Sequence, residues 1–216
     1  MIWLLKSCGI MAAVMVLWGG VGLAAPPPTL AHHLSLRIDP SRHRLEAFDR
    51  VTVEECQSSR LDFLLAEHLS VTGVRVNGAA ADYAYKQGRL QVLKPPPGPH
   101  CRIDIEYSGV FDDEIPMDPV NTDNPGFGVT GTISLQGTML LSGARWYPYT
   151  PGAPSKYEIT VDAPEGVVAI TSGSPLGHAT EKGRSVSRWR VDSPLRGIPL
   201  VAGPYIVSTK QYGSVA

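Results

Sequence analysis

The sequence feature that most constrains the fold is a strict alternation of apolar and charged side chains over residues 101–107. The odd positions hold Cys, Ile, Ile and Tyr, and the even positions hold Arg, Asp and Glu. Successive side chains of a β-strand point to opposite faces, so this pattern predicts a strand with one buried face and one solvated face. Shorter alternations recur in 34–38, 44–55 and 89–92, and no apolar stripe of helical period appears after residue 25. The pattern predicts an all-β chain.

Turn signals separate these strands. Asp39-Pro40 follows the first strand, and Asn77-Gly78 favours a hairpin because both central residues of its turn need a positive φ. Further apolar or alternating runs predict strands at residues 132–141, 157–161, 167–171, 185–191 and 200–208. Many short strands with Gly- and Pro-containing turns predict an antiparallel β-sandwich over residues 32–208.

The first 24 residues differ from the rest of the chain. Lys6 is their one charged residue, an apolar run over 10–21 follows, and Gly22 and Ala24 form a small-residue cleavage site. This order predicts a signal peptide at 1–24, followed by a Pro-rich linker at 25–31. An exported protein is expected, periplasmic or extracellular. The alternative is an uncleaved segment that anchors the protein in a membrane.

Two cysteines remain after the leader, which itself contains Cys8. Cys56 follows the predicted strand 44–55, and Cys101 begins the strand 101–107. If these strands are antiparallel neighbours, the end of one lies beside the start of the other. Because exported proteins keep disulfides, we predict a bond between Cys56 and Cys101.

Catalytic patterns are missing from the sequence. It contains no His-Glu-x-x-His and no Gly-x-Ser-x-Gly. His32 and His33 are adjacent on a predicted strand, so they point to opposite faces, cannot share a metal ion, and are expected at the surface. The net charge of −1 without a basic stripe argues against nucleic acid as a partner. We therefore assign no catalytic residue, no metal ligand and no cofactor to this chain.

An aromatic cluster at 145–149, Arg-Trp-Tyr-Pro-Tyr, leaves two interpretations open. Its rings could stack on a sugar, which would make the chain a self-contained exported binding module for carbohydrate or protein. Such rings more often belong to the core or to an interface with another domain. In the interface interpretation, Trp146, Tyr147 and Tyr149 form an apolar patch that a partner covers.

Four segments carry a resemblance to a known family. They are Ile-Glu-Tyr-Ser-Gly at 105–109, Ala-Arg-Trp-Tyr-Pro at 144–148, the run from Tyr157 to Gly173 through Pro-Glu-Gly, and Val-Ala-Gly-Pro-Tyr at 201–205. In order and spacing they resemble the N-terminal β-domain of the aminopeptidase N family of zinc metallopeptidases, the gluzincins. The match is to a divergent branch.

The resemblance implies a saddle-like, non-catalytic β-domain that packs on a downstream catalytic domain of the same polypeptide. That domain would hold the zinc ion and hydrolyse N-terminal residues from peptides. Its Gly-x-Met-Glu-Asn and His-Glu-x-x-His motifs would follow the present chain, of which residues 209–216 would begin the continuation.

Two departures from the family concern the substrate. The family places a substrate-contacting Gln shortly before Ala-Arg; counting without gaps puts Thr138 there, and the nearest glutamine is Gln136. Both are candidate substrate-binding residues. The family's Phe-Asp-Glu-Pro is replaced by Tyr-Thr-Pro-Gly-Ala-Pro at 149–154.

Overall fold

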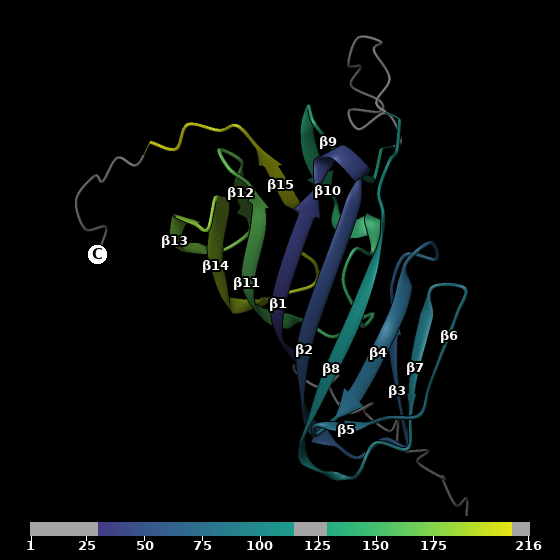
Figure 1. Cartoon of the computed structure of the whole chain (residues 1–216). Helices are drawn as coiled ribbons and strands as arrows, with labels where there is room; N and C mark the ends of the chain where they lie inside the picture. The colour runs from purple at the N-terminus through teal and green to yellow at the C-terminus, as the bar shows by residue number, and fades with distance from the viewer. Residues whose placement is uncertain (1–29, 115–128, 209–216) are drawn as a thin grey trace, which may run out of the picture.

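The computed structural model describes residues 30–114 and 129–208, and these fold into three β-sheets (Figure 1). The expected leader, the linker up to residue 29 and the continuation at 209–216 lie outside the described residues. No described helix is long and apolar enough to cross a membrane. Within residues 30–114 and 129–208, the regular structure other than strands consists of two 3-10 turns, at Pro40–Arg42 and Ser142–Ala144.

The largest sheet has eight strands and forms the curved wall of the molecule (Figure 1). All neighbouring strands in it are antiparallel except β1 and β11, which run parallel. In spatial order the strands are β13 (Ser174–Glu181), β14 (Arg184–Leu195), β11 (Ser155–Pro164), β1 (Leu30–Asp39), β2 (Arg44–Cys56), β8 (Gly98–Val110), β4 (Ser70–Val76) and β5 (Ala79–Ala80).

Two smaller antiparallel sheets accompany the large one. The four-stranded sheet contains, in order, β12 (Val168–Thr171), β15 (Leu200–Gly203), β10 (Gly137–Leu140) and β9 (Gly131–Ser134). The three-stranded sheet contains β3 (Arg60–Leu64), β7 (Arg89–Leu93) and β6 (Tyr83–Lys86). The buried apolar side chains of all three sheets form one core, so the prediction of an all-β, mainly antiparallel sandwich is confirmed.

The alternation over residues 101–107 has the predicted consequence. Cys101, Ile103, Ile105 and Tyr107 are all buried under the large sheet. Asp104 lies on the opposite face, yet only 8% of its surface is exposed. Arg50 of the neighbouring strand bonds its carboxylate at 2.8 Å, which compensates for the lost water.

The Asn77-Gly78 hairpin is confirmed, with φ values of 52° and 88° at the turn between β4 and β5. Two strand boundaries were wrong. Residues 132–141 form the hairpin β9–β10, because the chain reverses at Leu135–Gln136 and Gly137 adopts a φ of 155°. The strand predicted at 200–208 ends at Gly203, after which the chain leaves the sheet.

Cys56 and Cys101 are joined by a disulfide that links the end of β2 to the start of β8. The two strands are antiparallel neighbours, with Val53 opposite Cys101 and Cys56 opposite Gly98. Their Cα atoms lie 5.7 Å apart, inside the range that a disulfide requires. The bond therefore fixes one end of the two longest strands.

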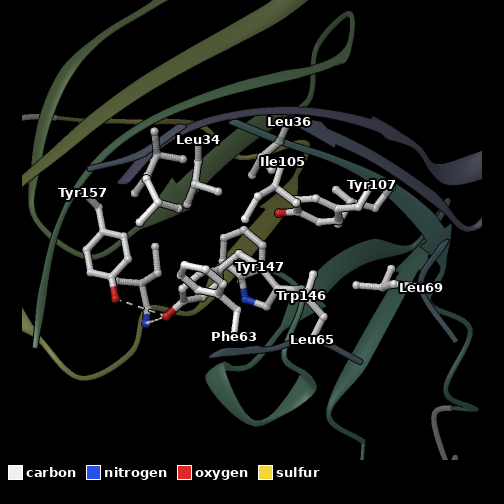
Figure 2. Packing of buried hydrophobic residues seen from close by; sticks show 14 of the residues in the cluster. Leu34, Leu36, Phe63, Leu65, Leu69, Ile105, Tyr107, Trp146, Tyr147 and Tyr157 are labelled. Carbon is white, nitrogen blue, oxygen red and sulfur yellow. Dashed lines mark hydrogen bonds between the residues drawn. The ribbon is translucent and has the colours of Figure 1, made fainter. Parts of the chain in front are cut away.

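Trp146 and Tyr147 are at the centre of the core, with 0% and 1% of their surface exposed (Figure 2). Arg145 takes a left-handed conformation after the second 3-10 turn, and the backbone then runs beside β3, where Tyr149 bridges Leu64. The expectation that the aromatic cluster forms an apolar surface patch was wrong. Because Trp146 and Tyr147 are buried, their rings cannot stack on a sugar.

Candidate functional site

The two candidate substrate-binding residues lie on the hairpin β9–β10. Gln136 is exposed in the turn, so its amide is free to reach a ligand. Thr138 is only 4% exposed and pairs with Ala202 of β15. The structure thus places Gln136 alone at the surface, and the role of both residues in binding substrate stays a prediction.

This hairpin belongs to a sheet that carries no charge. The sixteen residues of β9, β10, β12 and β15 include no Asp, Glu, Lys or Arg; the strand sequences are GTIS, GTML, VAIT and LVAG. In β10 and β12 the residues alternate between half-buried and buried, and in β15 Val201 is half-buried while the other three residues are buried. One side of the sheet therefore faces the core, and the other faces outward without charged groups to solvate it.

The outward side of this sheet is apolar. Cross-strand pairing aligns Ile170 with Val201, Val201 with Met139, and Met139 with Thr132. Val168 lies on the same side of β12 as Ile170, two residues away. We call Met139, Val168, Ile170 and Val201 the apolar face. Contiguous apolar surface of this kind on a β-sheet usually marks an interface.

Further apolar side chains are exposed near the ends of these strands. Leu135 in the hairpin turn is 78% exposed, and Ile206, after β15, is 98% exposed. A small cavity of about 90 Å³ lies between Leu135 on one side and Gly203 and Pro204 on the other. The hairpin turn and the segment after β15 are therefore neighbours, and together they extend the uncharged surface.

The outer face of the eight-stranded sheet is the opposite in character. Its strands carry cross-strand ion pairs, among them Arg50 with Asp104 at 2.8 Å and Arg190 with Glu158 at 3.0 Å. Such pairs at exposed positions contribute little to stability but keep the face soluble. Of these two faces, the uncharged face of the four-stranded sheet has the composition expected of a domain interface, because the core of an interface is depleted in charged residues.

A buried polar cluster lies between the sheets. His32 of β1 is 1% exposed, so the expectation that it is a surface residue was wrong; His33, its neighbour, does lie at the surface. The His32 Nδ1 atom is 2.7 Å from Oδ2 of Asp49, which is fully buried on β2. The imidazole also stacks on the ring of Tyr157, with centroids 5.1 Å apart.

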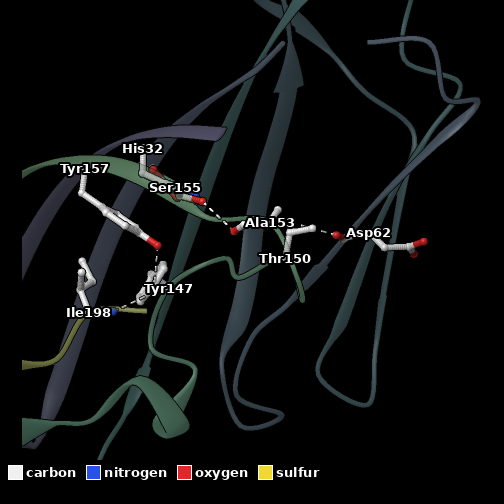
Figure 3. A network of polar contacts seen from close by, with 9 residues as sticks. His32, Asp62, Tyr147, Thr150, Ala153, Ser155, Tyr157 and Ile198 are labelled. Atoms are coloured by element: carbon white, nitrogen blue, oxygen red, sulfur yellow. Dashed lines mark hydrogen bonds and ion pairs between the residues drawn. The ribbon is translucent and has the colours of Figure 1, made fainter. Parts of the chain in front are cut away.

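Three tyrosines lie near this pair. Figure 3 shows Tyr147 and Tyr157 beside His32, and Figure 2 shows Tyr107 in the same core. The Ile198 backbone N–H donates to the Tyr147 hydroxyl at 3.2 Å, and the hydroxyls of Tyr147 and Tyr157 are 3.3 Å apart. Burial raises the pKa of Tyr107 well above its usual value, and the nearby charge of Asp49 raises it further. Every member of the cluster is enclosed, so we interpret it as a structural network and not as a substrate site.

The described residues offer no grouping suited to metal chemistry. Within residues 30–114 and 129–208, no three His, Cys, Asp or Glu side chains lie close enough together to hold a metal ion. A catalytic zinc ion needs three protein ligands and an open position. The zinc ion that the resemblance implies would therefore require residues outside the described part of this chain.

Comparison with solved structures identifies the fold. A variant of a two-domain M1 zinc metallopeptidase bound to L-tryptophan matches 81% of this chain, with a TM-score of 0.65 and 20% identity. This chain has the fold of the N-terminal β-domain of M1 zinc metallopeptidases. A variant of the Deinococcus radiodurans M1 zinc metallopeptidase bound to a Tyr-Ser-Ala substrate matches with a TM-score of 0.63 and 20% identity, also over 81% of this chain.

A more distant match is yeast LTA4 hydrolase in complex with bestatin, at 14% identity and a TM-score of 0.57 over 80% of this chain. This chain spans only part of these structures: 42% of the first, 41% of the Deinococcus protein and 28% of the yeast protein. No family model and no curated protein matches the sequence. The resemblance to the aminopeptidase N family is thus confirmed at the level of the fold.

Proposed function

We propose that this chain is the non-catalytic N-terminal β-domain of an exported zinc aminopeptidase. The observation that carries the proposal is the fold, which is shared with M1 zinc metallopeptidases that extend well beyond the matched part. The whole protein would remove N-terminal residues from peptides, using a zinc ion held by a downstream catalytic domain. This chain would contribute to the walls of the cleft, with Gln136 as its candidate contact to the peptide.

Export is supported by two features of the chain. The first 24 residues have the charged, apolar and small-residue order of a signal peptide. The bond between Cys56 and Cys101 requires an oxidising compartment, which the periplasm and the extracellular space provide. A reducing cytosol would remove this bond.

The catalytic domain would dock on the apolar face. Met139, Val168, Ile170 and Val201 supply uncharged surface, and exposed Leu135 and Ile206 extend it. Burying such surface against a partner releases about 25 cal/mol per Å². The charged outer face of the large sheet would remain in water.

A charge on the apolar face should disrupt docking. In the full polypeptide, Val201→Asp is expected to loosen the two domains because the carboxylate would be buried without a partner. Thr52→Asp, a half-buried position on the outer face of the large sheet, is the matched control. Limited proteolysis should release the β-domain faster in the Val201→Asp protein only. Equal rates for both variants would contradict this docking surface.

The chain by itself should have no zinc and no peptidase activity. We expect metal analysis after dialysis to find no stoichiometric zinc, and leucine p-nitroanilide to remain uncleaved, because a metal site and a general base are both required. The full polypeptide should bind zinc and hydrolyse leucine p-nitroanilide. Turnover by the isolated chain that a chelator abolishes would contradict the proposal.

A further inference from the structure

A groove crosses the outer face of the eight-stranded sheet, away from the apolar face. Its volume is about 560 Å³, within the range of small-ligand sites. Side chains of five strands line it: β11, β1, β2, β8 and β4. In the middle of the groove the strand pairing sets Thr160 beside Ser35, Ser35 beside Phe48, and Phe48 beside Glu106.

The groove contains one carboxylate without a counter-ion. Glu46 pairs with Arg44 at 3.1 Å. Asp162 pairs with Arg184 and, at 3.8 Å, with Arg37. Glu106 is exposed and forms no ion pair with any residue that the structure describes. Glu106 is therefore the one carboxylate of the groove lining without an ion-pair partner among the described residues, whereas Asp162 is shared by two arginines.

An aromatic ring lies directly across from this carboxylate. Phe48 and Glu106 are opposite each other on neighbouring strands, which brings their Cβ atoms to about 5 Å. The guanidinium carbon of Arg50 already lies 5.6 Å from the Phe48 ring centroid. The ring is thus placed where it attracts a cation on one face. Arg50 itself pairs with Asp104 at 2.8 Å and not with Glu106.

Gly73 keeps the Glu106 carboxylate accessible. Strand β4 has an irregularity between Val71 and Gly73, and Gly73 lies opposite Glu106. A Cβ atom at Gly73 would come within 3.6 Å of Glu106 Oε2. Because glycine has no side chain, the edge of the carboxylate facing β4 stays open. The hydroxyls of Ser35 and Thr160 add donors and acceptors along the groove.

We propose that this groove binds a basic peptide segment through a lysine ammonium or arginine guanidinium held between Glu106 and Phe48. A single unpaired carboxylate suits a single cation. The remaining walls present both signs of charge, from Arg37 and Arg44 to Glu46 and Asp162, together with hydroxyls. Such walls match the polar, uncharged backbone of a peptide better than a polyamine, whose several cations would need several carboxylates.

The test is a titration of the purified chain, followed by backbone amide NMR shifts, with the peptide acetyl-Gly-Lys-Ser-amide. Shifts are expected at Phe48, Glu106 and Gly73. The same peptide with an acetylated lysine ammonium should bind at least about fivefold more weakly, because the charge and its cation–π contact are lost. Raising the ionic strength should weaken binding of the charged peptide by screening.

Glu106→Gln should weaken binding about fivefold or more, while Glu165→Gln, an exposed acid on the loop between β11 and β12, should leave it unchanged. Both residues are exposed, and the spectra themselves report whether each variant is folded. Equal binding of the acetylated peptide, equal binding by Glu106→Gln, or shifts confined to other surfaces would overturn the proposal. Spermidine binding more tightly than the peptide, with the same dependence on Glu106, would also overturn it by assigning the groove to polyamines. None of these results depends on a catalytic domain, so the proposed peptidase role is tested separately.

Discussion

Asp49→Ala is expected to lower the free energy of unfolding by about 3–5 kcal/mol, one of the two largest effects that we predict. The substitution leaves the His32 imidazole buried without its partner and opens a space between β1 and β2. A buried polar group that loses its hydrogen bond keeps the cost of its desolvation. Urea denaturation followed by tryptophan fluorescence, which reports on Trp146 in the core, measures the change.

The matched control for Asp49→Ala is Glu165→Ala, which removes a carboxylate from an exposed loop and should change stability by less than about 0.5 kcal/mol. The double variant His32→Leu, Asp49→Leu should recover much of the loss, since two apolar residues leave no unpaired polar atom. A stability of Asp49→Ala within the error of the control would contradict the structural role of this pair.

Removing the disulfide is the second large effect. The Cys56→Ala, Cys101→Ala variant should lose about 4 kcal/mol, the loop-closure entropy expected for a sequence separation of 45 residues. Alanine is chosen because both positions are buried, where the hydroxyl of serine would lack a partner. Denaturation of the oxidised chain, the reduced chain and the variant measures the loss.

The reduced chain is the internal control for that measurement, because it keeps both side chains and lacks only the bond. Its stability should fall to near that of the double-alanine variant. If reduction leaves the denaturation midpoint unchanged, the bond does not constrain the unfolded chain as predicted.

Local patterning was enough to predict the fold class. The alternation over 101–107 depends only on the period of two in a strand, and the structure buries the apolar positions as expected. The Asn77-Gly78 turn is equally local. In contrast, Leu135 obscured the turn in residues 132–141, because an apolar residue in a two-residue turn looks like a continuation of the strand.

The buried residues that were misplaced are those whose partners are distant in sequence. His32 shares parity with Leu34, Leu36 and Ile38, so its strand position indicated burial, but its partner Asp49 lies on the next strand. Asp49 interrupts the apolar side of β2, as His32 interrupts that of β1. The reason for both polar residues, their hydrogen bond to each other, becomes apparent only when β1 and β2 are paired. Trp146 follows an irregular turn. The sequence there has neither the periodicity of a strand nor that of a helix, so it does not indicate which side chains face the core.

The candidate interface was visible in the sequence as an absence of charge. Residues 129–144 and 197–209 contain no Asp, Glu, Lys or Arg. A search for catalytic motifs passes over such segments, because an interface needs no particular residue type. Only the pairing of β10 with β15 shows that the two segments form one surface.

The most direct test of the central claim is the intact mass of the mature protein recovered from its natural source with an antibody against this chain. The account predicts a single polypeptide much heavier than 23.2 kDa, containing His-Glu-x-x-His after the present sequence and binding zinc. A mature product no heavier than 23.2 kDa, without a catalytic domain, would contradict it.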